Sequence, residues 1–125
     1  MFSINGLKVI IVGGSRGIGQ ALTCGFIKAN ARVTILDINA PDFKADFDFI
    51  KCDLAEQISI EKALNKYHAD NSVADVLINC AAITIPGESH LYNDSDWLKS
   101  LSVNLSGIFF LCREVGRKMI ESKVK

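Results

Sequence analysis

The sequence has little of what metal sites, disulfide frameworks and nucleic-acid binding require. Its 125 residues include only four cysteines and two histidines, and no two cysteines form a CxxC pair. We therefore expect neither a metal site nor a disulfide framework. Fourteen basic residues balance fourteen acidic ones, so the charge gives no basic excess for a nucleic acid and no bias towards a membrane. A small molecule is the expected partner.

The chain also lacks a long apolar run and a secretory type of N-terminus. Residues 1–5 contain no basic segment followed by an apolar stretch, and no run approaches the roughly 20 apolar residues of a membrane span. The sequence therefore predicts a cytoplasmic protein, in agreement with reduced thiols. With 49% hydrophobic and 22% charged residues, the composition indicates one compact domain over residues 1–125.

Strand and helix patterns alternate along the chain. Short apolar, partly β-branched runs predict strands at residues 8–12, 32–36, 47–52 and 75–79. Apolar residues at helical spacing predict helices over residues 17–29 and 56–70 and a long helix that begins near residue 94. The segment 39–46 is too short for a normal crossover helix. Such alternation is typical of a doubly wound parallel α/β sheet, and we expect the strand order 3-2-1-4.

Each predicted helix carries an apolar stripe that we expect to pack on the sheet. The stripe of the first helix is Ile18, Ala21, Leu22, Phe26 and Ala29, with Asn30 as a left-handed cap. The stripe of the second is Ile60, Ala63, Leu64 and Tyr67. The stripe of the long helix is Trp97, Leu101, Leu105, Ile108, Cys112, Val115 and Met119, with Asp94 or Ser95 as its cap. Its second apolar flank, residues 108–111, suits either an oligomer interface or a further part of the domain.

A glycine-rich segment, Gly13-Gly14-Ser15-Arg16-Gly17-Ile18-Gly19, lies directly between the first predicted strand and helix. Gly13 permits a tight exit from the strand, Gly17 lets the backbone approach a pyrophosphate, and Gly19 lets the helix pack closely on the strand. The N-terminus of the helix offers N–H groups and partial positive charge to phosphates. Because strand, loop and helix follow in this order, the segment predicts a Rossmann-type dinucleotide site rather than an ordinary turn.

An acidic residue, Asp37, ends the second predicted strand. A carboxylate there accepts hydrogen bonds from an adenosine ribose and repels a 2′-phosphate, so it favours NAD over NADP. Arg16 suggests the opposite, because a basic side chain in the loop pairs with a 2′-phosphate. We give Asp37 more weight, since a phosphate dianion beside it is repelled.

With these features in place, the chain resembles the classical short-chain dehydrogenase/reductase family along almost its whole length. Its loop has the GxxxGxG spacing of that family, and Asn79-Cys80-Ala81-Ala82 corresponds to the family motif NNAG. The resemblance implies that Asp53-Leu54 contacts adenine and that Asn104, in Val103-Asn104-Leu105-Ser106-Gly107, belongs to the catalytic tetrad and organises a water. The predicted cofactor-binding residues are Gly13, Ser15, Arg16, Gly17, Ile18, Gly19, Asp37, Asp53, Leu54, Asn79, Ala81 and Ala82.

The chain departs from the family pattern in three places. Cys80 and Ala82 replace the second Asn and the Gly of NNAG, and the segment between the second and third strands is short. The sequence also contains no counterpart of the family's serine and Tyr-x-x-x-Lys: Tyr67 and Tyr92 are followed four residues later by Asn71 and Asp96. In the family the tyrosine exchanges a proton with the substrate while hydride moves to or from nicotinamide.

Three hypotheses follow from the sequence. In the first, the chain is the cofactor-binding half of an NAD-dependent oxidoreductase for a secondary alcohol or ketone, and the remainder supplies Ser, Tyr and Lys. In the second, it is an inactive module that holds NAD. In the third, it is a structural or interaction protein that pairs through the open edge of its fourth strand and its long helix. An apolar strand edge is usually covered in native proteins, which favours the first hypothesis.

Overall fold

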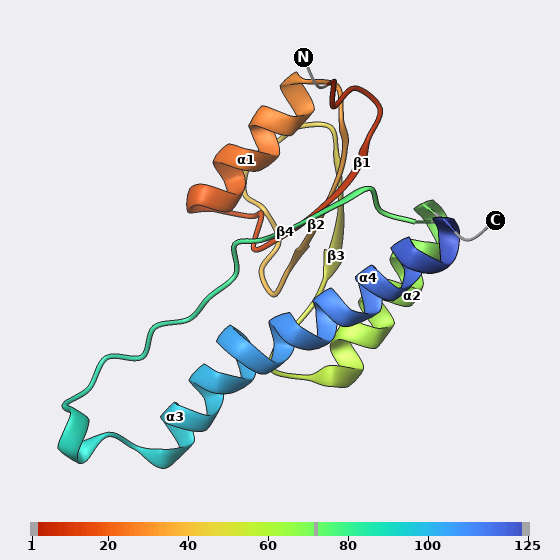
Figure 1. Cartoon of the computed structure of the whole chain (residues 1–125). Coiled ribbons are helices and arrows are strands. Elements are labelled where there is room, and N and C mark those ends of the chain that lie inside the picture. The colour runs from red at the N-terminus through yellow and green to blue at the C-terminus, as the bar shows by residue number, and fades with distance from the viewer. Residues whose placement is uncertain (1–2, 72, 124–125) are drawn as a thin grey trace.

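The computed structural model of the chain describes residues 3–71 and 73–123, and in these residues four parallel strands form one sheet. The strands are β1 (Lys8–Val12), β2 (Arg32–Asp37), β3 (Phe47–Lys51) and β4 (Val76–Asn79). Their order is β3-β2-β1-β4, which confirms the predicted topology (Figure 1). In the register of the sheet, Ile11 of β1 lies beside Ile35 of β2 and Ile78 of β4.

Helices cover both faces of this sheet. Helix α1 (Gly17–Lys28) lies on one face, and α2 (Gln57–Asn71) and α4 (Ile108–Lys123) lie on the other (Figure 1). No helix joins β2 to β3, as the short segment predicted. A parallel sheet between two helical layers is the doubly wound arrangement.

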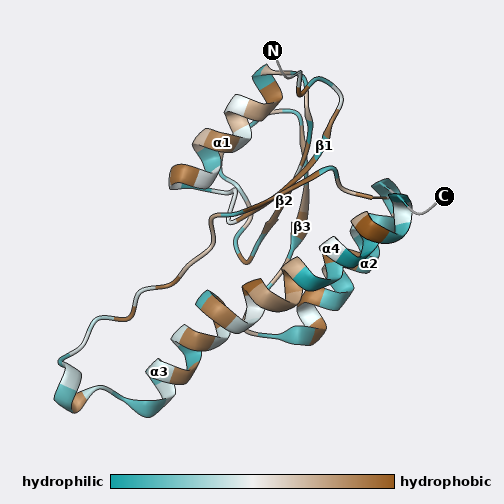
Figure 2. Cartoon of the chain, in the orientation of Figure 1, coloured by the Kyte–Doolittle hydropathy of each residue, from teal (hydrophilic) through white to brown (hydrophobic). Residues whose placement is uncertain are grey.

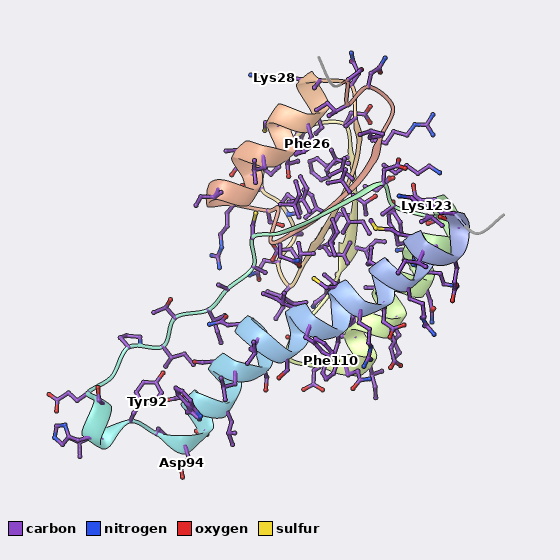
Figure 3. The ribbon with its side chains drawn as sticks, in the orientation of Figure 1. Phe26, Lys28, Tyr92, Asp94, Phe110 and Lys123 are labelled. Atoms are coloured by element: carbon purple, nitrogen blue, oxygen red, sulfur yellow. The ribbon has the colours of Figure 1, made fainter. Side chains whose placement is uncertain are left out.

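Strand β1 forms the centre of the core because its side chains alternate between the two layers. Val9 and Ile11 pack towards α1 and its Phe26, whereas Ile10 and Val12 pack towards α2 and α4. Figure 2 shows the apolar colouring of these central strands, and Figure 3 labels Phe26 on α1. Complete burial of an aliphatic side chain contributes about 1.5–3 kcal/mol, which explains why β1 has no polar alternation.

The prediction for α1 is correct in extent and partly wrong in its buried face. Asn30 has φ 61° and ends the helix, as expected of a left-handed cap. Ile18 is 77% exposed and Ala21 is also exposed. Leu22 and Phe26 of the predicted stripe do pack against the core. The fully buried positions are Gly19 and Thr23, because α1 approaches the end of β1 closely at Gly19.

Helix α2 agrees with its predicted stripe, since Ile60, Ala63, Leu64 and Tyr67 are all buried. These side chains join the cluster formed by β1, β2 and α4. The hydroxyl of Tyr67 is buried and has no hydrogen-bond partner among the described residues. Burial and the nearby charge of Asp75 raise the pKa of Tyr67 to about 12.

The long helix predicted from residue 94 is present from Asp94 to Lys123, but its internal geometry and its cap differ from the prediction. It consists of α3 (Asp94–Leu101), a π-helical turn η2 (Ser102–Gly107) and α4. Its cap is Asn93 rather than Asp94 or Ser95, because the Asn93 Oδ1 atom accepts a hydrogen bond of 3.0 Å from the Ser95 N–H.

The π-helical turn also changes which side of the long helix is buried. A π-turn places an extra residue within one turn, so a stripe extrapolated at 3.6 residues per turn loses its register. The buried residues are Val103, Gly107, Leu111 and Val115. Trp97, Leu105 and Cys112 of the predicted stripe are exposed. Gly107 lies against the backbone of Leu54, where an added Cβ would be 2.2 Å from the Leu54 carbonyl oxygen, and this approach fixes the inward face.

Between β4 and α3 the chain extends away from the sheet before it returns. This segment includes the short 3-10 helix η1 (Ser89–Leu91). Tyr92, labelled in Figure 3, donates a hydrogen bond of 2.6 Å from its hydroxyl to the Ile85 carbonyl oxygen. The contact closes the extended segment on itself.

The close approach of α1 gives a first prediction. We expect Gly19→Ala to lower the free energy of unfolding by more than about 3 kcal/mol, because the new Cβ would lie 1.9 Å from the Gly13 carbonyl oxygen and the backbone must shift. Gly25→Ala in the same helix is the matched control: its Cβ meets nothing within 4 Å, and we expect a gain of about 0.5–1 kcal/mol. Urea unfolding of both variants tests this, and equal stabilities would contradict it.

A second prediction concerns Tyr67. Because folding raises its pKa from 10.0 to about 12, the unfolded chain loses the phenolic proton first, and roughly 2–3 kcal/mol of stability is lost as the pH rises from 10 to 12. We expect Tyr67→Phe to flatten this alkaline decline and to leave stability at pH 7 unchanged or higher. Denaturant unfolding at both pH values measures it. A Phe variant that is clearly less stable at pH 7 would contradict the unpaired hydroxyl.

Candidate cofactor site

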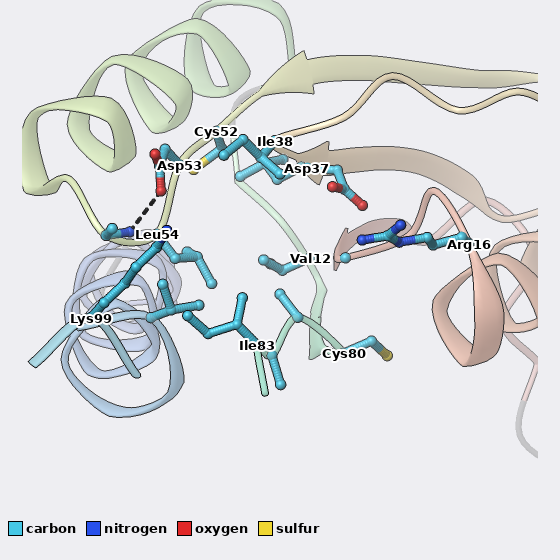
Figure 4. A pocket seen from close by; sticks show the side chains of 16 residues that line it. Val12, Arg16, Asp37, Ile38, Cys52, Asp53, Leu54, Cys80, Ile83 and Lys99 are labelled. Atoms are coloured by element: carbon cyan, nitrogen blue, oxygen red, sulfur yellow. Dashed lines mark hydrogen bonds between the residues drawn. The ribbon is translucent and has the colours of Figure 1, made fainter. Parts of the chain in front are cut away.

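A cavity of about 280 Å³ lies at the carboxyl ends of the parallel strands (Figure 4). Residues that follow all four strands contribute to it: Gly13 after β1, Asp37 at the end of β2, Asp53 after β3 and Ala81 after β4. Its size is close to the lower end, roughly 300 Å³, of small-molecule sites. Open α/β sheets bind ligands at this edge, where connections leave the sheet in opposite directions.

The glycine-rich loop forms one side of the cavity. Gly13 has φ +76°, and a Cβ there would lie 2.6 Å from the Ala81 nitrogen, so only glycine lets β1 exit against the chain that leaves β4. Gly17, Ile18 and Gly19 form the first turn of α1, whose N-cap Arg16 makes no side-chain capping hydrogen bond. The first turn of α1 therefore receives no capping hydrogen bond from its N-cap side chain, which suits a negatively charged group.

Asp37 joins the loop to the end of β2. Its carboxylate accepts hydrogen bonds from the backbone N–H of Ser15, at 3.2 Å, and of Asn39, at 3.1 Å. The Ser15 hydroxyl is buried and donates to the Asn39 carbonyl oxygen at 2.8 Å. Ser15 thus holds the loop in shape. Arg16 and Asp37 lie at the same end of the cavity in Figure 4.

Asp53 and Leu54 form the opposite end of the cavity. One carboxylate oxygen of Asp53 accepts a hydrogen bond of 2.9 Å from the Ala55 N–H, and the Asp53 N–H donates to the Ser59 hydroxyl at 2.9 Å. Apolar side chains line the space beside them: Leu36, Ile38, Leu54, Ile83 and Val103. Apolar walls with one carboxylate suit a flat heteroaromatic ring.

Cys52 also lines the cavity, and its thiol is not a nucleophile at neutral pH. Burial and the charge of Asp53 raise its pKa to about 11. The thiolate is the reactive form of cysteine, so Cys52 serves as an apolar wall.

The residues of the motif Asn79-Cys80-Ala81-Ala82 contact two different parts of the structure, the cavity and the long helix. Ala81 and Ala82 line the cavity. Asn79 is directed to α4, where its amide nitrogen donates to the Cys112 sulfur at 3.3 Å. Asn104, in the π-helical turn, binds Ile83 on both sides of its amide: its Oδ1 accepts from the Ile83 N–H and its Nδ2 donates to the Ile83 carbonyl, each at 2.8 Å. These two bonds hold the chain leaving β4 against η2.

The structure thus brings part of the predicted set together around one space. The predicted residues that line the cavity are Gly13, Arg16, Asp37, Asp53, Leu54, Ala81 and Ala82. The predicted residues outside its lining are Ser15, Gly17, Ile18, Gly19, Asn79 and Asn104. The remaining lining residues, which the sequence analysis did not assign to the site, are Val12, Leu36, Ile38, Cys52, Ala55, Cys80, Ile83, Lys99 and Val103. Several of them directly follow or end a predicted strand, and this position could have identified them. Lys99 could not be identified in this way, because its place depends on the orientation of α3. That these residues bind a cofactor stays a prediction.

Metal binding and membrane insertion concern the whole described part of the chain, residues 3–71 and 73–123. In this part of the chain, no group of three or more His, Cys, Asp or Glu side chains is arranged to hold a metal ion. Its helices include none with the length and apolar character needed to cross a membrane.

Comparison with known proteins gives a consistent result. The family model described as short chain dehydrogenase matches residues 7–124. The D-threitol dehydrogenase of Mycolicibacterium smegmatis is 28% identical over 131 residues, which cover 97% of this chain and 50% of that enzyme. The ligand-free aldohexose dehydrogenase of Thermoplasma acidophilum superposes with a TM-score of 0.89 at 27% identity, over 97% of this chain and 48% of that one.

A short chain dehydrogenase from Leptospira borgpetersenii, solved with bound NAD+, also has a TM-score of 0.89, at 28% identity, over 96% of this chain and 48% of that one. The chain therefore spans about half the length of the relatives it matches. Since the family model covers almost every residue and the sheet, the glycine-rich loop and the cavity agree with it, the chain belongs to the short-chain dehydrogenase family.

Proposed function

We propose that this chain is the NAD-binding half of an oxidoreductase that moves hydride between nicotinamide and a secondary alcohol or ketone. The observation that carries the proposal is the cavity between the glycine-rich loop and the two carboxylates, Asp37 and Asp53. The residues present fit the cofactor. Gly13 has no side chain at the point where the loop lies against the chain that follows β4. The walls of the cavity beside Asp53 are apolar.

Each part of the site has a proposed task. The loop and the N-terminus of α1 hold the pyrophosphate through backbone N–H groups. Asp37 accepts hydrogen bonds from the ribose hydroxyls, which favours NAD over NADP, and Asp53 with Leu54 holds the adenine. When bound, the nicotinamide accepts or donates a hydride. Because Arg16 lies at the end of the cavity near Asp37, NADP is the weaker ligand in this proposal rather than a forbidden one.

The relatives support the reaction class. One is a D-threitol dehydrogenase and another an aldohexose dehydrogenase, and both names point to hydroxyl-bearing small molecules as substrates. We propose that the serine and Tyr-x-x-x-Lys of the family come from further sequence of a longer protein, so that this chain alone lacks the proton donor. An inactive module that holds NAD is the alternative.

For Asn104 we propose a positioning task together with the predicted role in a proton relay. The Asn104 oxygen accepts one hydrogen bond from the Ile83 backbone and its Nδ2 donates one to it, so Asn104 holds the cavity wall that follows β4. A π-turn in a helix is frequent at functional sites, and here it presents Asn104 towards the carboxyl ends of the strands.

The outer face of the long helix is the surface for which we propose a protein partner. Leu105, Phe109 and Ile120 are each more than half exposed on it, with exposed fractions of 64%, 58% and 68%. Apolar side chains that gather on one helix mark an interaction surface. We propose a homo-oligomer through this helix, and an interaction role without cofactor binding is the competing account.

We propose the cytoplasm as the compartment of this protein. Cys24, Cys52, Cys80 and Cys112 are free thiols. Reducing compartments preserve free thiols, which supports this location. The proposed partner in that compartment is a small-molecule substrate.

Calorimetric titration with NADH and NADPH tests the cofactor. We expect saturable binding with NADH preferred, and we expect Asp37→Asn to reduce that preference about tenfold, because it removes the charge that repels the 2′-phosphate and keeps an acceptor oxygen. Asp48→Asn, an exposed change on β3, is the matched control and leaves the preference unchanged. Failure of the folded chain to bind either nucleotide would sink the proposal.

Sedimentation velocity tests the oligomer. We expect the wild-type chain to sediment as a dimer or larger species, and Ile120→Glu to sediment as a monomer, because a buried unpaired charge is costly in an interface. Ser122→Glu adds the same charge on the opposite side of α4 and is expected to keep the assembly. A monomeric wild type, or equal behaviour of both variants, would refute the helix as an interface.

A further inference from the structure

One acidic and one basic residue line each end of the cavity. Among the described residues these are Arg16, Asp37, Asp53 and Lys99. Figure 4 shows Arg16 with Asp37 beside the glycine-rich loop, and Lys99 with Asp53 and Leu54 at the far end. The first pair belongs to the site already argued. Lys99 has no assigned task.

Lys99 lines the cavity because the face of the long helix that carries it is turned towards the cavity. It lies on α3 four residues before Val103, so the two residues share a helix face, and both line the cavity. The approach of Gly107 to the Leu54 carbonyl holds this face against the loop that carries Asp53. Lys99 is exposed and makes no ion pair within 4.0 Å among the described residues, so its ammonium group is available to a ligand at the rim.

We infer that Lys99 is a specificity-determining residue that reads the purine base of the dinucleotide together with Asp53. This inference rests on the proposed function. One oxygen of Asp53 is engaged by the Ala55 N–H, and the other remains an acceptor. A carboxylate only accepts hydrogen bonds and an ammonium only donates them. The far end of the cavity therefore offers one acceptor and one donor between apolar walls.

Adenine matches this arrangement and a 6-oxopurine does not. The edge of adenine carries a donor, the 6-amino group, next to an acceptor, the ring nitrogen N1. When the amino group of adenine donates a hydrogen bond to Asp53, its N1 atom can accept one from the Lys99 ammonium group. Hypoxanthine in the same pose places its O6 acceptor against the carboxylate and its N1–H donor against the ammonium. Lys99 and Asp53 together thus favour a dinucleotide with a 6-aminopurine base over one with a 6-oxopurine base.

Calorimetric titration of the full chain with NADH and with its deamino analogue, reduced nicotinamide hypoxanthine dinucleotide, tests the inference. We expect the wild type to prefer NADH. Lys99→Met keeps the length of the side chain and removes the charge, and we expect it to weaken NADH about tenfold while it changes the affinity of the deamino analogue by less than about twofold. Lys62→Met, an exposed change on α2, is the control and leaves both affinities unchanged. Far-ultraviolet circular dichroism checks that each variant is folded.

The possible results distinguish failure of the role of Lys99 from failure of the proposed NAD site. Wild-type binding with an unchanged preference in Lys99→Met would overturn the role of Lys99 and leave the NAD site standing. Equal weakening of both nucleotides would also overturn it, because Lys99 would then act only through its charge on the phosphates. A folded wild type that binds neither nucleotide would remove the NAD site and this inference together.

Discussion

The close contact between the first turn of α1 and the end of β1 is the constraint on which the rest of the site depends. A side-chain carbon at Gly19 would lie 1.9 Å from the Gly13 carbonyl oxygen, and one at Gly13 would lie 2.6 Å from the Ala81 nitrogen. These two glycines let the helix, the end of β1 and the chain after β4 pass within backbone contact. The N-terminus of α1 is thereby brought to the edge of the sheet where the strands end, and the cavity lies beside it.

The opposite wall of the cavity depends on a second close contact. Gly107 approaches the Leu54 carbonyl, and the π-helical turn that contains it lets Asn104 bind the Ile83 backbone with both ends of its amide. The chain leaving β4 is thus fixed between the glycine-rich loop and the long helix. Both contacts require backbone proximity that a side chain would prevent, and the cavity is the space that remains between them.

The sequence predicts those parts of the fold that depend on local pattern. Runs such as residues 8–12 have no polar position, and the glycine spacing has one structural use, so the sheet order and the loop follow from residues close together in the chain. The inward face of the long helix does not follow, because the π-turn adds a residue whose position is set by a distant contact with Leu54. Lys99 does not follow from the sequence either, because its place beside the cavity depends on how α3 lies against the sheet. The prediction for Ile18 is wrong because periodicity does not say where a helix comes closest to a sheet.

A crystal structure of the chain grown with NAD+ tests the proposed cofactor site most directly. We expect the pyrophosphate against residues 13–19 and the adenosine in the cavity between Asp37 and Asp53. Continuous density for the nucleotide in that position would establish that a cofactor site forms within these residues. A well-ordered chain whose cavity stays empty at saturating NAD+, or which holds the nucleotide elsewhere, would show that the close contacts of Gly13 and Gly107 do not build a dinucleotide site.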